Sequence, residues 1–204
     1  MKIKSICPYS FGANTYLVFS GSRAFVVDPA VSVSSILSAA AEEGATLDGI
    51  LLTHGHFDHT VAIDTLRRAT SVPVYIHEND AIMLTDGKKN GYYDFYGKEC
   101  VHLPAENTLI DGQVISIGNE QLRVIHTPGH TQGSVCFVCD EFMITGDTLF
   151  ADTIGRCDLW GGNELQMRDS LKKLRTFDQK LKIFAGHGAP ASLGGALDSA
   201  AYYI

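Results

Sequence analysis

Short apolar runs alternate with polar turns along the first quarter of the chain. Runs at residues 3–7, 14–19 and 24–27 predict strands, because turn signals at 11–13 and 20–22 separate them. Residues 33–43 then place Ile36, Leu37, Ala40 and Ala41 at helical spacing, and Gly44 ends that helix. The chain therefore opens as an antiparallel meander followed by an amphipathic helix.

Strands and helices alternate in the next part of the chain. The pattern predicts a strand over 47–52, a helix over 59–70, a strand over 72–76 and a short helix over 78–84. This alternation is typical of a layered α/β structure.

Residues 86–107 interrupt the alternation. Structure-breaking residues at 87–91 precede a cluster of aromatic side chains, Tyr92, Tyr93, Phe95 and Tyr96. We expect an irregular loop whose rings pack either on the core or on a bound substrate, and both alternatives stay open.

The last part of the chain is again rich in strands. They are predicted at 114–117, 122–126, 134–138, 142–145 and 182–185, with helices over 163–177 and 192–203. Two β-rich halves, each followed by helices, indicate an α/β fold: an αββα sandwich flanked by helices, in a single domain over residues 1–204.

Composition narrows the possible partners and the cellular location. The 204 residues are 45% hydrophobic and carry a net charge of -7, which disfavours nucleic acid and anionic membranes as partners. No apolar stretch reaches the length of a membrane span or a signal peptide, so we expect a soluble, cytoplasmic protein. The five scattered cysteines fit reduced thiols, and Cys136 and Cys139, at the predicted strand over 134–138, fit core or surface thiols.

Residues 53–59, which directly follow the strand at 47–52, concentrate side chains that can ligate a metal: His54, His56, Asp58 and His59. A lone His-x-His can be an ordinary pair of exposed polar side chains, and an Asp near a helix start can be a helix cap. Four such residues after a buried strand would repel one another or stay unsatisfied without a cation, which favours a metal site.

Three further candidate ligands each follow a predicted strand and lie beside a glycine: His130, Asp147 and His187. Ligands far apart in the sequence must meet in space, and placement at strand ends would bring them to one edge of a β sandwich.

Together these residues resemble the ligand set of the metallo-β-lactamase-fold hydrolases over nearly the whole chain. Residues 146–150 and 154–162 are similar to the glyoxalase II-like (hydroxyacylglutathione hydrolase-like) branch, in its short subgroup without the C-terminal helical domain. The resemblance implies His54, His56 and His130 on one metal, Asp58, His59 and His187 on a second, and Asp147 bridging both. It implies two divalent ions, Zn above all, with Fe or Mn as alternatives.

The activity that the resemblance implies is hydrolysis of a small-molecule thioester, similar to S-lactoylglutathione, by a metal-bridging hydroxide that Asp58 orients. Arg156, Tyr92, Tyr93 and Tyr96 are candidate substrate-binding residues, and Arg156 can instead pair with an acidic neighbour.

Other activities stay open. They are those of a mononuclear iron persulfide dioxygenase, a lactonase or lactamase, or a metal-binding scaffold without turnover. The remaining histidines, His77, His102 and His126, lie outside the motif and are not expected to ligate.

Overall fold

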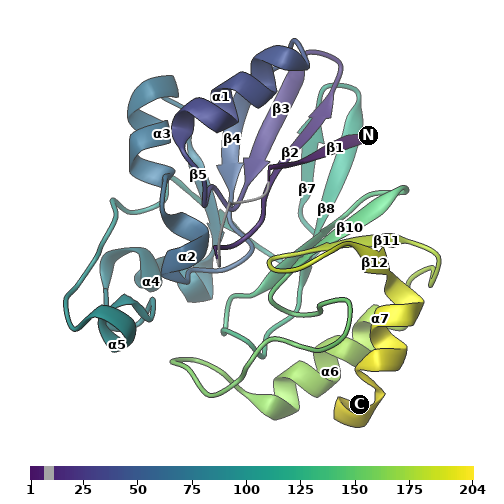
Figure 1. The fold of residues 1–204 in the computed structure, drawn as a ribbon. Coiled ribbons are helices and arrows are strands. Elements are labelled where there is room, and N and C mark those ends of the chain that lie inside the picture. Colours follow the sequence, from purple (N-terminus) through teal and green to yellow (C-terminus); the bar gives the residue numbers. More distant parts are fainter. Residues whose placement is uncertain (7–11) are drawn as a thin grey trace.

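The computed structural model describes residues 1–6 and 12–204 and has four layers. Two six-stranded sheets face each other, and helices cover the outer face of each sheet (Figure 1). This arrangement confirms the αββα sandwich predicted from the sequence. The described residues contain no helix of the length and hydropathy needed to cross a membrane.

The first sheet has the strand order β1-β2-β3-β4-β5-β6. Its first three strands are antiparallel neighbours, and β3 to β6 run parallel. The strands are β1 (Lys2–Ile6), β2 (Thr15–Ser20), β3 (Arg23–Val27), β4 (Thr46–Leu51), β5 (Val74–His77) and β6 (Asn107–Leu109).

The second sheet has the order β12-β11-β10-β9-β8-β7, and all its neighbours are antiparallel except β10 and β11. The strands are β7 (Val114–Ile117), β8 (Glu120–His126), β9 (Val135–Val138), β10 (Phe142–Gly146), β11 (Lys182–Ala185) and β12 (Ala191–Ser192).

Two longer helices lie on each half, α1 (Val33–Glu42) and α3 (Ile63–Thr70) on the first, α6 (Glu164–Leu174) and α7 (Leu193–Ser199) on the second. Their starts follow local chemistry: Ser32, Asn163 and Ser192 each accept a backbone N–H at a helix N-terminus.

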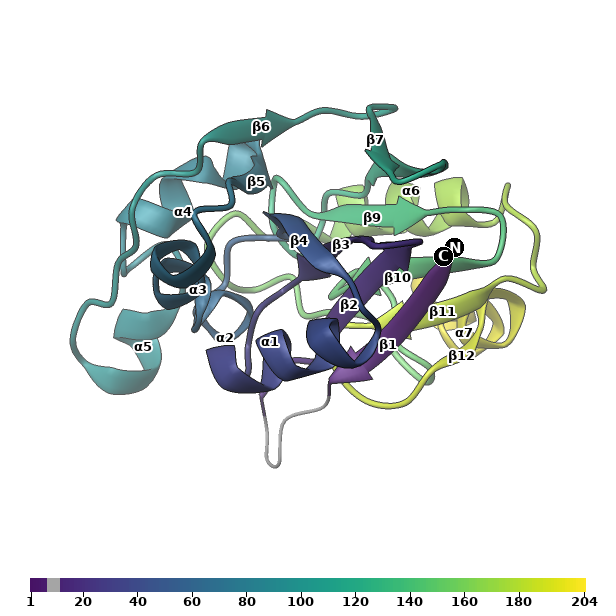
Figure 2. The same ribbon diagram turned by 90° about the horizontal axis from the view of Figure 1, so that it is seen from above.

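Shorter helical segments fill the connections. They are α2 (Phe57–Thr60), η1 (Glu78–Asp80), α4 (Ala81–Thr85), α5 (Tyr92–Tyr96) and η2 (Ala201–Tyr203). Seen from above, α5 lies at the opposite end of the molecule from α7 (Figure 2).

Alternation along the strands builds three apolar layers. Leu17 packs toward the helices of the first half, whereas its neighbours Tyr16 and Val18 pack between the sheets. In the second sheet Phe184 points between the sheets and Ile183 points toward α6 and α7. Both faces of the central strands are therefore buried, and the candidate metal ligands lie beyond the ends of the strands.

The structure corrects the helix predicted over 59–70, which is two helices. The first begins earlier, at Phe57, and the second begins at Ile63. The break lies at Ala62, whose N–H donates to the carbonyl of Pro29 at 2.9 Å. That contact turns the chain between the segment that carries Asp58 and the segment that packs on the sheet.

The irregular loop predicted over 86–107 is also wrong, because it contains α5 and the start of β6. Gly91 and Gly97 bracket α5 with φ of 82° and 66°. The helix predicted over 163–177 is shorter at both ends, since α6 spans Glu164–Leu174. The helix predicted over 192–203 ends at Ser199 as α7, and η2 follows it. The short strand β12 was not predicted.

Residues 7–11, which include the end of the first predicted strand and part of the first turn signal, lie outside the described residues. Among the rest, Cys100, Cys136, Cys139 and Cys157 are free thiols, in agreement with the expectation from the sequence.

Candidate metal centre

The strand-to-helix turn after β4 holds the first group of polar side chains. In Figure 1 the arrow of β4 points down toward α2, which follows it along the chain. His54 lies in the turn, and its ring centroid is 4.8 Å from that of His56 and 4.2 Å from that of His59. The turn therefore gathers imidazoles from both of its sides, as the sequence predicted.

The first cluster consists of His54, His56 and His130, each of which offers one ligand atom within 4.8 Å of the other two. All three side chains are buried. The closest pair is His56 Nδ1 and His130 Nε2, 2.8 Å apart, although 74 residues separate them in the sequence. The loop between β8 and β9 thus completes a site begun after β4.

The second cluster consists of Asp58, His59 and His187, again with ligand atoms within 4.8 Å of one another. The Oδ2 atom of Asp58 lies 3.3 Å from His187 Nε2 and 3.9 Å from His59 Nε2. His187 follows β11, so this cluster also draws on both sheets.

Asp147, at the end of β10, lies between the two clusters. Its Oδ1 atom is 3.4 Å from His59 Nε2, and its Oδ2 atom is 3.5 Å from His130 Nε2 and 3.6 Å from His187 Nε2. One carboxylate therefore reaches ligands of both clusters, which is the position a bridging group requires.

Outer hydrogen bonds orient several of the imidazoles. His130 Nδ1 is 2.7 Å from the carbonyl of Arg156, and His59 Nδ1 is 2.9 Å from Asp28 Oδ2. His54 Nδ1 lies 3.0 Å from the hydroxyl of Thr53. Because these contacts suit protonated Nδ1 atoms, each of the three rings turns an unprotonated Nε2 toward the site.

The residues present fit divalent cations. His54 Nε2, His59 Nε2 and Asp147 Oδ1 are buried and have no hydrogen-bond partner among the described residues. A buried polar atom without a partner is costly, and three that converge on one place indicate a missing positive charge. Cations bound there would satisfy all three atoms at once.

The electrostatics divide the site in two. Burial, and then neighbouring imidazoles, lower the pKa of His54 well below its usual value and the pKa of His56 to about 3, which keeps both rings neutral. Burial would also lower the pKa of His59, but Asp147, Asp58 and Asp28 outweigh it and raise that pKa. A bound cation would displace the extra proton of His59, because neutral imidazoles and ionised carboxylates are the forms that ligate metals.

Two buried aspartates support the site and were missed from the sequence. Asp28, at the end of β3, accepts from the backbone N–H of Thr53 at 2.8 Å and from its hydroxyl at 2.6 Å, besides facing His59. Its φ of 49° is unusual for a residue other than glycine. The available signal was its position at a strand tip, which it shares with the candidate ligands.

Asp80 has a different role. Its carboxylate accepts from Gly55 N–H at 3.2 Å, Gly133 N–H at 2.7 Å and the hydroxyl of Thr131 at 2.6 Å. It therefore connects the turn that carries His54 to the loop that carries His130. Burial raises the pKa of Asp80, and these hydrogen bonds counteract the increase.

The glycine beside His187 is required by close packing. A Cβ atom on Gly186 would overlap Asp147 Oδ1 and would lie 2.6 Å from His59 Cε1. Only a residue without a side chain lets the chain after β11 approach the carboxylate of Asp147 this closely.

A cavity of about 790 Å³ opens in front of the clusters. Tyr96 and Arg156, both predicted to bind substrate, line it, whereas Tyr92 and Tyr93 are absent from its described lining. The other described lining residues are Gly12, Ala30, His56, Phe57, Asp58, Val61, Asn90, Gly91, Phe95, His130, Asp147, Phe150, Gly155, Leu159 and His187.

Arg156 forms a two-pronged ion pair with Asp158, with N···O distances of 2.6 and 2.7 Å. This is the acidic neighbour that the structural interpretation of Arg156 requires, and both side chains are exposed. The aromatic residues of α5 do not enter the core, since no residue of that helix is buried. Tyr92, Phe95 and Tyr96 pack instead around Phe57, next to Asp58.

The remaining histidines lie outside the site. His77 and His126 stack on each other with ring centroids 4.2 Å apart, and His126 Nε2 is 2.9 Å from the carbonyl of Gln132. His102 lies between Asp64 and the hydroxyl of Thr60.

Comparisons with known proteins agree with this geometry. Residues 9–187 match the family described as the metallo-beta-lactamase superfamily. The chain is 36% identical over 179 residues, 86% of its length and 85% of the relative's, to the "Probable metallo-hydrolase YqgX" of Bacillus subtilis (strain 168).

Solved structures are similar over almost the whole chain. BLEG-1 B3 metallo-beta-lactamase shares 31% identity with a TM-score of 0.90, and the match covers 97% of each chain. TTHA1623, solved in a di-iron-bound form, shares 30% identity with a TM-score of 0.83 over 99% of this chain and 100% of that one.

Proposed function

The chain belongs to the metallo-beta-lactamase superfamily, and from its site we propose that it is a hydrolase that uses two divalent cations, most simply zinc, to cleave small thioesters. The observation that carries the proposal is the position of Asp147, within 3.4 to 3.6 Å of imidazoles from both clusters. A single mononuclear site would leave Asp58, His59 and His187 without a cation.

Two bound cations would supply a water of lowered pKa, down to about 7 from roughly 15.7, and a positive charge to polarise a carbonyl. His54, His56 and His130 would hold one cation, Asp58, His59 and His187 the other, and Asp147 both. The ligands are imidazoles and carboxylates without a thiolate, which suits Zn and also Fe or Mn.

Asp58 has a second role in this proposal. Its side chain is 29% exposed and lines the cavity, whereas His59, next to it in the sequence, is fully buried. A carboxylate has about four acceptor positions, so Asp58 can accept a hydrogen bond from a water in the cavity while it ligates. That contact would orient the attacking oxygen toward the substrate carbonyl.

Thioesters are the preferred substrate class for two reasons. The sequence at 146–150 and 154–162 resembles the glyoxalase II-like branch. A departing thiolate is also stable enough near neutral pH to need no dedicated proton donor. The cavity, at about 790 Å³, has room for a substrate of moderate size.

A second candidate is the hydrolysis of β-lactams. The similarity to BLEG-1 B3 metallo-beta-lactamase, with a TM-score of 0.90, favours testing it. A chromogenic cephalosporin assay separates the two activities: turnover of the lactam with no thioester cleavage would replace the thioester proposal.

The decisive experiment measures metal content and thioester turnover on one sample. We expect two metal ions per chain and hydrolysis of neutral thioesters that is lost on chelation and regained on adding zinc. One iron per chain with oxygen uptake would instead favour a persulfide dioxygenase. A fully loaded sample inactive on thioesters, lactones and lactams would favour a binding scaffold.

A further inference from the structure

One side of the cavity is a patch of exposed apolar side chains that the metal clusters do not explain. It consists of Val61, Phe95 and Tyr96, here called the apolar wall, whose exposed fractions are 61%, 58% and 59%. Side chains of this kind gain most from contact with another apolar group, because they still have most of their surface in water.

The apolar wall is fixed to the metal ligands through Phe57. The ring centroid of Phe57 lies 5.5 Å from that of Phe95 and 5.8 Å from that of Tyr96. Phe57 begins α2, the short helix that also carries Asp58, and Val61 caps that helix four residues later. Residues four apart share a helix face, so the wall and the ligands are held by the same turn.

The backbone reinforces this attachment. The N–H of Phe57 donates to the carbonyl of Asn90 at 3.1 Å, just before α5 begins. A side chain on the neighbouring Gly91 would contact both His56 and Phe57, which shows how closely this segment approaches the ligands. The wall therefore stands at a fixed place beside the reacting centre.

Charges in and around the cavity argue against an anionic substrate group. Arg156 is the one lysine or arginine among the described lining residues, and it is paired with Asp158. On the segment before α5, Lys88 lies over the ring of Tyr93, while Lys89 pairs with Asp86 and lies over the ring of Trp160. A carboxylate in the substrate would meet no unpaired lysine or arginine in this lining.

We propose that the apolar wall binds an uncharged apolar group of the substrate, so that the preferred substrates are thioesters with a hydrocarbon substituent next to the reacting carbonyl or its sulfur. This inference rests on the proposed hydrolase function and adds the substrate class to it. Each methylene group that the wall covers should raise kcat/KM roughly fourfold.

Two substrate series test the proposal on the zinc-loaded full chain. In the first, the acyl chain grows from acetyl to butyryl to hexanoyl on the neutral thiol N-acetylcysteamine. In the second, the acetyl group is kept and the thiol grows from ethanethiol to hexanethiol. We expect kcat/KM to rise steeply in one series, which identifies the half that contacts the wall. Flat values in both series overturn the proposal.

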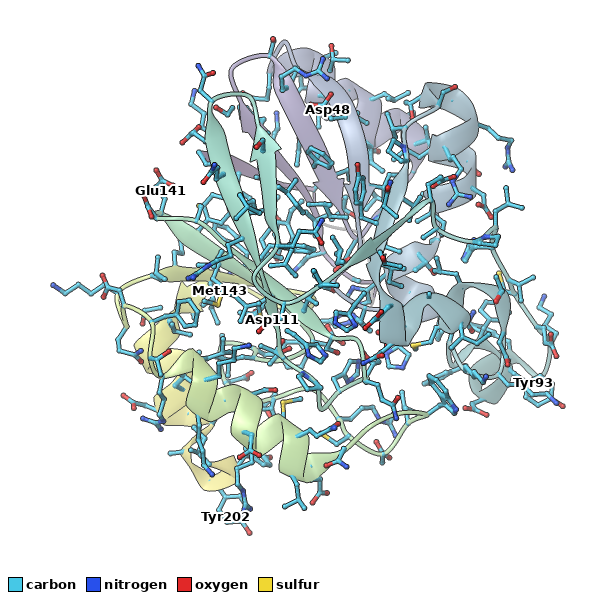
Figure 3. All side chains as sticks on the ribbon, turned by 180° about the vertical axis from the view of Figure 1, so that it is seen from behind. Asp48, Tyr93, Asp111, Glu141, Met143 and Tyr202 are labelled. Carbon is cyan, nitrogen blue, oxygen red and sulfur yellow. The ribbon has the colours of Figure 1, made fainter. Side chains whose placement is uncertain are left out.

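Variants locate the effect on the wall. Phe95→Ala should reduce the preference for the longest over the shortest substrate about tenfold, and Phe95→Leu should keep most of the preference. Tyr202→Ala is the matched control, since this aromatic side chain is 93% exposed and lies at the other end of the molecule from Tyr93 and α5 (Figure 3). Equal loss in both alanine variants would contradict the assignment.

A binding measurement separates this inference from the proposed function. A hexyl thioether analogue of the substrate cannot be hydrolysed, and its affinity for the zinc-loaded protein can be measured by calorimetry. If no thioester is turned over, the proposed function fails, but weaker binding to Phe95→Ala than to the wild type still supports the wall. Equal binding to the two proteins overturns it.

Discussion

Replacing Asp28 with Asn tests whether the support of the ligands is as important as the ligands themselves. The carboxylate is 1% exposed and faces three hydrogen-bond donors: the N–H and hydroxyl of Thr53 at 2.8 and 2.6 Å, and His59 Nδ1 at 2.9 Å. Asn has nearly the same shape and tolerates a positive φ, so the backbone conformation should persist.

The amide cannot accept from all three donors. One of its two oxygens becomes an NH₂ group, which would face either the backbone N–H of Thr53 or both the hydroxyl of Thr53 and His59 Nδ1. At least one buried donor loses its partner, at a cost of about 1–3 kcal/mol. Since the lost partner is charged, we expect the free energy of unfolding to fall by about 2–3 kcal/mol. With the NH₂ group at the Oδ2 position, His59 also loses its fixed orientation, and such outer contacts typically change metal affinity about 10–100-fold.

Urea unfolding of chelator-treated protein measures the first effect, and zinc titration of the folded protein measures the second. Asp48→Asn is the control. Asp48 also lies on the first sheet, far from α5 in Figure 3, and it pairs with the exposed side chain of Arg23. That change should cost less than about 1 kcal/mol and leave metal binding intact. An Asp28→Asn variant with the stability and zinc affinity of the wild type would refute the reasoning.

Three further predictions concern other parts of the molecule. His187→Ala should lower the metal content toward one ion per chain and abolish most hydrolysis, whereas His126→Ala should keep two ions by elemental analysis. Burial, with His126 stacked on it, lowers the pKa of His77 to about 4. The His77 imidazole of the unfolded chain takes up a proton near pH 6.5, whereas that of the folded chain does so only near pH 4. The contribution of neutral His77 to the free energy of unfolding should therefore be complete above about pH 6.5 and lost as the pH falls toward 4. Unfolding of chelator-treated His77→Phe should therefore show a shallower decline over this range. Asp158→Asn should free Arg156 and raise kcat/KM for S-lactoylglutathione about threefold to tenfold, whereas Arg156→Lys should leave kcat/KM nearly unchanged. A change in kcat/KM for Arg156→Lys with none for Asp158→Asn would place Arg156 in substrate binding.

The sequence predicted the layers and the convergence of the clusters because both depend on local patterns. Short apolar runs bounded by turn signals marked most strands, and four potential ligands within six positions marked the turn after β4. His130, Asp147 and His187 could be added because each follows a strand and adjoins a glycine.

The supporting aspartates could not be predicted in this way. Asp80 lies in an ordinary polar stretch, and its partners Thr131 and Gly133 are 51 and 53 residues away in the sequence. Only the folded chain shows that its carboxylate joins two loops. Asp28 looked like the end of a strand, and nothing in its neighbours indicated His59 as a partner.

The prediction of an irregular loop over 86–107 was wrong for a different reason. Helices are recognised from a sequence by the apolar stripe that they bury, and α5 buries none of its residues. Its aromatic side chains face the cavity and the solvent, so their spacing carried no signal of a core.

The way α5 is attached also has a consequence for how new activities could arise on this scaffold. Both of its flanking residues are glycines in the left-handed conformation, and the helix contributes nothing to the three apolar layers. The segment between Gly91 and Gly97 is therefore an exchangeable part: its sequence can vary without disturbing the three apolar layers. Libraries confined to these five positions should retain folding and metal binding while they sample substrate preference, which makes this short helix the place to begin redesign.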